Sequence, residues 1–84
     1  MAKVKIFVTM GCPFCRNMME WLKTYEVEHE RVVFESATSK MAFYAANPGV
    51  TTVPQMFVDD VRVGGWSELQ KHPFKAAVEE EFNK

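Results

Sequence analysis

The chain contains two cysteines, and they lie three residues apart in the segment Cys12-Pro13-Phe14-Cys15. Residues 3–8, just before this segment, alternate lysine with apolar side chains and then become wholly apolar, which predicts a strand entering a covered sheet. Pro13 suits the first turn of a helix, where its missing backbone N–H is not needed. Both thiols are therefore expected at a strand-to-helix turn, which favours an α/β fold.

Length and composition are those of an ordinary globular chain. With 84 residues there is room for one domain, which we place at residues 1–84. Apolar residues make up 48% and charged residues 25%, which excludes intrinsic disorder, and a net charge of −1 offers no basic face for a nucleic acid. Apolar runs are too short for a membrane span and lysines interrupt the N-terminal residues. We therefore expect no signal peptide, no membrane contact and a cytoplasmic location.

The rest of the chain continues the alternation of strands and helices. After the strand at 3–8 we predict a helix at 13–25, a strand at 28–34, a helix at 38–47, strands at 54–58 and 61–63, and a last helix from residue 67 that Pro73 splits, with a second segment at 73–82. The order βαβαββα predicts a small α/β sandwich. Its four-stranded mixed sheet is parallel in the first pair of strands and antiparallel in the closing hairpin, with helices on both faces.

The cysteine pair indicates redox chemistry. A helix N-terminus favours an anion, so Cys12 is the expected attacking thiolate, and Cys15 is expected to be less exposed and to resolve the mixed disulfide. A bridge between them would close too short a loop to stabilise the fold much. Zinc needs four ligands, and His29 and His72 lie in different elements, so we predict no metal site. An iron–sulfur role and inert thiols stay open as alternatives.

Thr52-Val53-Pro54 is a second candidate segment. Proline is tolerated at the first residue of a strand, and local sequence alone favours an ordinary trans bond before it. A cis bond would instead let Val53 turn its backbone N–H and C=O outward, where they could pair with an extended peptide.

Gly64-Gly65-Trp66-Ser67-Glu68 is a third candidate segment, where the last predicted helix begins. Ser67 and Gln70 have the spacing of a capping box, so we expect the helix to open there. Free N–H groups at such a start can bind a carboxylate, although a plain tight turn into the helix explains the glycines equally well.

These three segments together, with Thr52-Val53-Pro54 continuing into Gln55-Met56-Phe57-Val58, resemble the glutaredoxin family. The resemblance runs from residue 3 to about residue 69 and agrees with the predicted order of elements. It implies the thioredoxin-like fold, a cis bond between Val53 and Pro54, and a glutathione-dependent thiol–disulfide oxidoreductase.

The resemblance also implies roles for individual residues. Cys12 would attack a disulfide or a glutathionylated thiol, Cys15 would then attack Cys12, and two glutathione molecules would restore the dithiol. Val53 would pair through its backbone with glutathione, and Lys40 would lie near its glycine carboxylate. The other implied glutathione contacts are Thr52, Pro54, Gly65, Trp66 and Ser67, while Pro13 and Phe14 shape the dithiol turn.

The implied partners follow from this chemistry. Glutathione would be a co-substrate, with no tightly bound cofactor, in electron transport and cell redox homeostasis. The protein would act as a monomer on disulfide-bonded or glutathionylated proteins, with ribonucleotide reductase as a candidate.

Three positions depart from the family pattern and favour an alternative. Thr9 stands where a lysine is frequent, Met41 where an Arg, Lys or Gln is usual, and Trp66-Ser67 where an acidic segment is usual. A glutaredoxin-like redoxin that is reduced by thioredoxin reductase and serves ribonucleotide reductase often has a Trp-Ser pair there. A further alternative, without enzymatic activity, is an iron–sulfur cluster-binding glutaredoxin, which Pro13 disfavours.

Overall fold

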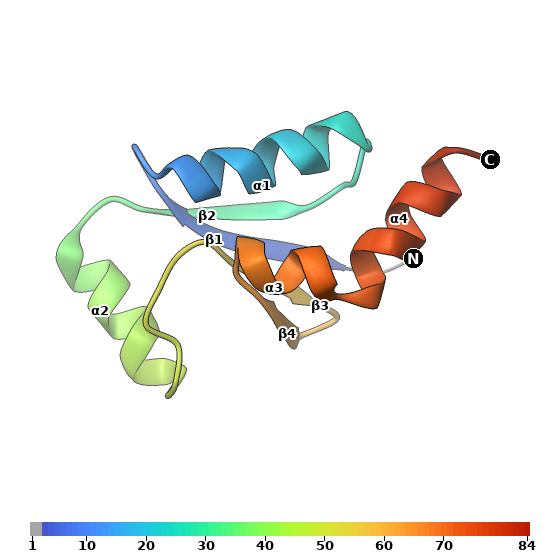
Figure 1. Ribbon diagram of the computed structural model, residues 1–84. Helices are drawn as coiled ribbons and strands as arrows, with labels where there is room; N and C mark the ends of the chain where they lie inside the picture. Colours follow the sequence, from blue (N-terminus) through green and yellow to red (C-terminus); the bar gives the residue numbers. More distant parts are fainter. Residues whose placement is uncertain (1–2) are drawn as a thin grey trace.

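The computed structural model describes residues 3–84 and contains a four-stranded mixed sheet (Figure 1). Its strands are β1 (Val4–Thr9), β2 (Glu30–Phe34), β3 (Gln55–Val58) and β4 (Val61–Gly64), in the order β2-β1-β3-β4. β1 runs parallel to β2 and antiparallel to β3, and β3 pairs antiparallel with β4. The predicted mixed sheet and its closing hairpin are confirmed.

Helices lie on both faces of this sheet, as predicted. α1 (Pro13–Thr24) and α3 (Trp66–Lys71) contact each other over one face, and α2 (Ala37–Ala46) packs on the other. α4 (Pro73–Phe82) begins at Pro73, which confirms the predicted split of the last helix. Within residues 3–84, none of the helices is long and apolar enough to cross a membrane.

The face beneath α1 and α3 is a closed aliphatic core. Side chains alternate across a strand, so every second residue of β1 points toward this face and the helices cover it. Five large apolar side chains of this core are 0% exposed, namely Ile6, Met18, Leu22, Met56 and Leu69. This packing fixes α1, and with it the turn that carries the cysteines.

The opposite face is aromatic. The ring of Phe7 in β1 lies 4.4 Å from Phe43 of α2, 5.9 Å from Phe34 and 5.6 Å from Phe57, measured between centroids. Tilted and edge-on rings at such separations attract each other. The cluster holds α2 against the sheet, with the start of α2 beside Thr9 at the end of β1.

Candidate functional site

The turn between β1 and α1 positions the two thiols. Gly11 has a positive φ of 75°, a conformation that glycine adopts at no steric cost, and the chain then enters α1. Cys12 is the N-cap of α1 and Pro13 is its first residue. The Cys15 backbone N–H donates a hydrogen bond of 3.3 Å to Cys12 Sγ, so the sulfur takes the place of a capping oxygen.

The two thiols differ in exposure, as predicted. Cys12 is half-buried, and its Sγ donates a hydrogen bond of 3.9 Å to the Val53 carbonyl oxygen. Cys15 is 0% exposed and lies in the core. Burial first, and then the hydrogen bond with Cys12, raise the pKa of Cys15 to about 11, so this thiol keeps its proton at neutral pH. Among residues 3–84, no three His, Cys, Asp or Glu side chains are grouped so that they could hold a metal ion.

The segment that faces Cys12 is held by a buried amide. The Val53–Pro54 bond is cis, as the resemblance implies and against the local expectation. Gln55 is 1% exposed; its Nε2 donates to the Thr52 carbonyl oxygen at 3.0 Å, and its Oε1 accepts from Arg62 Nε at 3.1 Å. Sequence analysis did not single out Gln55, whose one signal is a polar side chain in an otherwise apolar strand.

Two glycines let β4 and α3 approach this segment closely. Gly64 has a φ of 116°, and a Cβ at this position would lie 2.8 Å from the Glu68 side chain. A Cβ at Gly65 would lie 3.1 Å from the Pro54 carbonyl oxygen. Glycine at both positions therefore allows the start of α3 to pack against the cis-proline segment.

The start of α3 differs from the prediction. Ser67 and Gln70 form no capping box, because α3 already begins at Trp66 with Gly65 as its N-cap. Three residues after this cap, Glu68 Oε1 accepts a hydrogen bond of 2.8 Å from the Gly65 N–H. Glycine serves as an N-cap almost as well as serine, so the Ser-based prediction was wrong by two residues.

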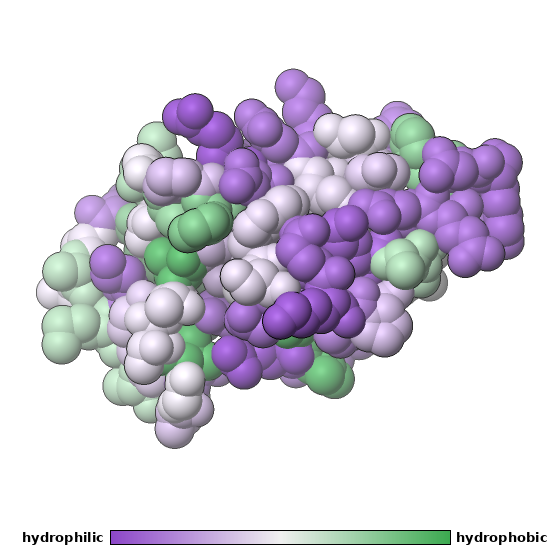
Figure 2. Space-filling view, in the orientation of Figure 1, coloured by the Kyte–Doolittle hydropathy of each residue, from purple (hydrophilic) through white to green (hydrophobic). Residues whose placement is uncertain are grey.

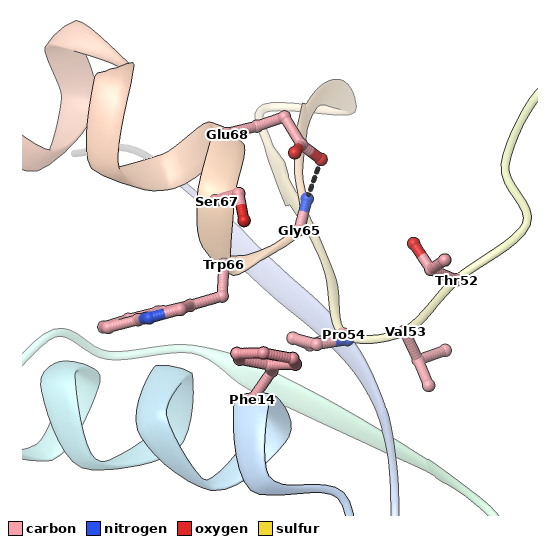
Figure 3. Close-up of a pocket in the computed structure, with 8 residues that line it drawn as sticks. All are labelled: Phe14, Thr52, Val53, Pro54, Gly65, Trp66, Ser67 and Glu68. Atoms are coloured by element: carbon pink, nitrogen blue, oxygen red, sulfur yellow. Dashed lines mark hydrogen bonds between the residues drawn. The ribbon is translucent and has the colours of Figure 1, made fainter.

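These segments enclose a pocket of about 230 Å³ (Figure 3). Phe14 reaches it from the start of α1 and is 57% exposed, as expected for the middle of the dithiol turn. The indole of Trp66 comes from α3 and lies to the left of Phe14 in the view of Figure 3. The residues lining the pocket are Phe14, Thr52, Val53, Pro54, Gly65, Trp66, Ser67 and Glu68. The structure thus brings together the two predicted groups of glutathione contacts, at 52–54 and 65–67.

Glu68 belongs to the third candidate segment, Gly64-Gly65-Trp66-Ser67-Glu68, but was not among the predicted glutathione contacts. Its carboxylate lies directly after Trp66-Ser67, the pair that stands where an acidic segment is usual in the family. A sequence signal for it does exist, since acidic residues are favoured in the first turn of a helix. Recognising that signal required the correct helix start.

Lys40 lies outside the pocket. It is half-buried and lines a neighbouring hollow of about 420 Å³ that includes Thr9 and Met10, at the other end of the dithiol turn. Met10 is 83% exposed and Met41 is 68% exposed. In Figure 2, apolar side chains gather over α2 and the start of α1, whereas hydrophilic ones cover α4.

Comparisons with known proteins agree with this arrangement. The Glutaredoxin family model matches residues 4–63. Glutaredoxin 3 of Escherichia coli K12 is 30% identical over 69 residues, which cover 82% of this chain and 83% of that protein. Glutaredoxin 1 of Francisella tularensis, solved with cacodylate, has a TM-score of 0.79 and 28% identity over 100% of both chains. A buckwheat glutaredoxin–glutathione complex is similar in fold alone, with a TM-score of 0.75 and 13% identity over 95% of this chain and 76% of that one.

Proposed function

The chain belongs to the glutaredoxin family, and from this premise we propose that it is a glutathione-dependent thiol–disulfide oxidoreductase. Family membership supports the general activity, which is the oxidation and reduction of thiols by thiol–disulfide exchange. One observation carries the proposed division of labour between the two cysteines. The half-buried Cys12 sulfur caps a helix, and a buried, protonated Cys15 lies directly behind it.

The two cysteines divide the reaction with a protein disulfide. The Cys12 thiolate attacks one substrate sulfur; a mixed disulfide forms, the substrate disulfide breaks, and the other substrate sulfur leaves and takes up a proton. Cys15 then loses its proton and attacks Cys12 Sγ, which forms the Cys12–Cys15 disulfide and releases the second substrate thiol. Two glutathione molecules reduce this disulfide and become glutathione disulfide, so two electrons pass from glutathione to the substrate.

A glutathionylated protein requires only Cys12. The Cys12 thiolate attacks the glutathione sulfur, the protein thiol leaves, and a second glutathione removes the first as glutathione disulfide. Cys15 is not needed in this route, because Cys12 itself never has to form an internal bridge.

Glutathione would extend from the pocket past Cys12. The extended backbone at Val53, next to Thr52 and Pro54, would pair with the tripeptide, and its cysteine sulfur would then meet Cys12 Sγ, which already contacts the Val53 carbonyl. Lys40, in the hollow that includes Met10, would meet the glycine carboxylate. The buckwheat protein was solved as a glutathione complex, so a protein of this fold holds the tripeptide.

The γ-glutamyl end of glutathione carries a carboxylate and an ammonium group. The start of α3, with Gly65, Trp66 and Ser67, would hold the carboxylate by the backbone N–H groups that follow Gly65 and by the Ser67 hydroxyl, since the Gly65 N–H itself donates to Glu68. The Glu68 carboxylate would attract the ammonium group, and thus provides the charge that Trp66-Ser67 lacks.

The proposal also covers the location, oligomeric state and substrates of the protein. The protein would work as a cytoplasmic monomer, with glutathione as co-substrate and without a tightly bound cofactor. Its substrates would be disulfide-bonded and glutathionylated proteins, and ribonucleotide reductase is a candidate among them.

A second candidate function has its own observation. Trp66 lines the pocket where glutathione would lie, and Met41 on α2 is 68% exposed and uncharged. Both features favour a redoxin that is reduced by thioredoxin reductase, which has no need to bind the glycine and γ-glutamyl carboxylates of glutathione.

A choice of reductant tests both proposals. The protein is oxidised to the Cys12–Cys15 disulfide and supplied with NADPH and either glutathione plus glutathione reductase or thioredoxin reductase alone. NADPH consumption is then followed with a small mixed disulfide of glutathione for wild type, Cys12→Ser and the matched control Cys15→Ser.

Turnover with glutathione that disappears in Cys12→Ser and persists in Cys15→Ser is the expected result. Mass spectrometry of the Cys15→Ser protein should then find one glutathione bound to Cys12. Turnover with thioredoxin reductase alone that requires both cysteines would overturn the glutathione assignment and establish the second candidate.

A further inference from the structure

A second hollow lies beside α1, away from the glutathione pocket. It measures about 490 Å³ and is bounded by one side of α1 and by the neighbouring strand β2. Its lining contains three cations and one carboxylate, and consists of Arg16, Met19, Glu20, Lys23, His29 and Arg31. We call it the α1–β2 groove. Because the whole chain has a net charge of −1, this concentration of positive charge is a local feature.

The cations of the α1–β2 groove are unbalanced. Elsewhere lysines meet acidic partners, as Lys5 does with Glu30 at 3.5 Å and Lys75 with Glu79 at 2.7 Å. In contrast, within residues 3–84 no ion pair involves Arg16, Lys23 or Arg31.

The neighbours of these cations leave their charge available. Glu20 is the one acidic side chain among the lining residues, and it is set against three permanent cations. Arg31 Nη1 contacts the uncharged Met19 Sδ at 3.2 Å, and His29 Nδ1 pairs with the Val27 carbonyl oxygen at 2.9 Å. An anionic ligand would therefore not have to displace a carboxylate from Arg31.

The α1–β2 groove lies beside an open strand edge. β2 is the outermost strand in the order β2-β1-β3-β4, so one side of its backbone has no strand partner in the described chain. Phe34 packs with Phe7 on the α2 side, and side chains alternate, so Arg31 and Val33 face the α1 side. Val33 is 37% exposed. Cations, an apolar contact and an open strand edge together suit an extended polypeptide better than a compact anion.

The α1–β2 groove begins close to the dithiol. Arg16 directly follows Cys15, and its backbone N–H donates to the Cys12 carbonyl oxygen at 3.0 Å, one helical turn away. We propose that the α1–β2 groove binds an acidic, extended segment of a protein substrate while Cys12 attacks a disulfide near that segment. The placing of the disulfide rests on the proposed function, whereas binding of the acidic segment rests on the groove alone.

Peptide binding tests the groove without any redox chemistry. A fluorescent peptide rich in Asp and Glu with one Leu is compared with a twin in which Asn and Gln replace the acids. The variants are K23Q/R31Q, which removes two groove cations, and K71Q/K84Q, which removes the same charge outside the groove. Arg16 is left unchanged because it adjoins the dithiol.

The acidic peptide should bind wild type on the order of tenfold more tightly than its twin, and added salt should reduce this preference. K23Q/R31Q should abolish the preference and K71Q/K84Q should retain it. Equal binding of the two peptides, an equal loss in both variants, or tighter binding of a single-stranded oligonucleotide than of the acidic peptide would overturn the proposal.

Turnover then separates this proposal from the proposed function. With disulfide-containing versions of the two peptides, kcat/KM should favour the acidic one in wild type but not in K23Q/R31Q, while a small uncharged disulfide is reduced equally by both. If wild type reduces no disulfide at all, the proposed function fails and the binding result still stands.

Discussion

The two sides of the first turn of α1 meet opposite surroundings. On the outer side, Phe14 is 57% exposed and lines a pocket made of loops and a helix start, and Cys12 contacts the carbonyl oxygen of the lining residue Val53. On the inner side, Cys15 lies with Met18 and Leu22 in the aliphatic core, where all three are 0% exposed. Three residues of sequence thus separate a thiol that can meet substrates from one that can meet only its neighbour.

This difference explains how two chemically identical side chains acquire different roles. The outer sulfur lies at the N-terminus of α1, where it accepts the Cys15 N–H and faces the Val53 carbonyl oxygen. The inner sulfur is surrounded by hydrocarbon, which disfavours its charged form. The comparison teaches that the core is part of the proposed redox site, because it keeps Cys15 protonated until Cys12 has reacted.

The largest expected effect comes from removing a buried side chain on the inner side of α1. Leu22→Ala removes a fully buried side chain and should lower the free energy of unfolding by about 2–5 kcal/mol. Phe14→Ala, its control on the outer side, should change it by less than about 0.5 kcal/mol. Urea denaturation followed by circular dichroism measures both. Similar losses would mean that the two sides are not distinct in packing.

The next largest effect is expected on the stability of the folded protein at high pH, where the buried thiol titrates. The pKa of Cys15 is raised from 9.0 to about 11, so the folded protein holds a proton that the unfolded chain releases in this range. Its contribution is complete below pH 9.0 and is lost as the pH rises through about 11. The stability of wild type relative to Cys15→Ala should therefore fall by about 2 kcal/mol between these limits.

The measurement is urea denaturation of both proteins under reducing conditions across this pH range. Deprotonation of lysines affects both proteins alike, so it cancels in the difference. A difference that stays constant with pH would show that burial does not hold the proton on Cys15.

The smallest expected effect is on the outer side. Glu68→Gln keeps an acceptor for the Gly65 N–H but removes the charge offered to the ammonium group of glutathione. The KM for a glutathionylated peptide should rise about fivefold, equivalent to about 1 kcal/mol, with little change in kcat. The matched control is Glu80→Gln, an exposed residue of α4 outside the pocket. An equal KM in both variants would show that the Glu68 charge does not contribute to the binding of glutathione.

Much of this architecture could be predicted because the signals are local. Alternation in residues 3–8, Pro13 at a helix start and the spacing of Cys12 and Cys15 depend only on neighbouring residues. They led to the correct order of elements and to the correct difference in burial between the thiols. The Val53–Pro54 bond was harder, since local preference favours trans and only the family resemblance indicated the observed cis form.

The sequence by itself determined the order of elements and the dithiol turn, because short-range patterns specify them, while the resemblance to a family indicated the segments that form the pocket. Tertiary structure decided the rest. Glu68 joins the pocket because α3 starts at Trp66, and Gln55 is buried because Thr52 and Arg62 satisfy its amide. The α1–β2 groove exists because α1 and the edge strand β2 pack side by side. Such features depend on where each element starts and on which side chains meet when the elements pack, and the pattern of apolar residues does not specify either.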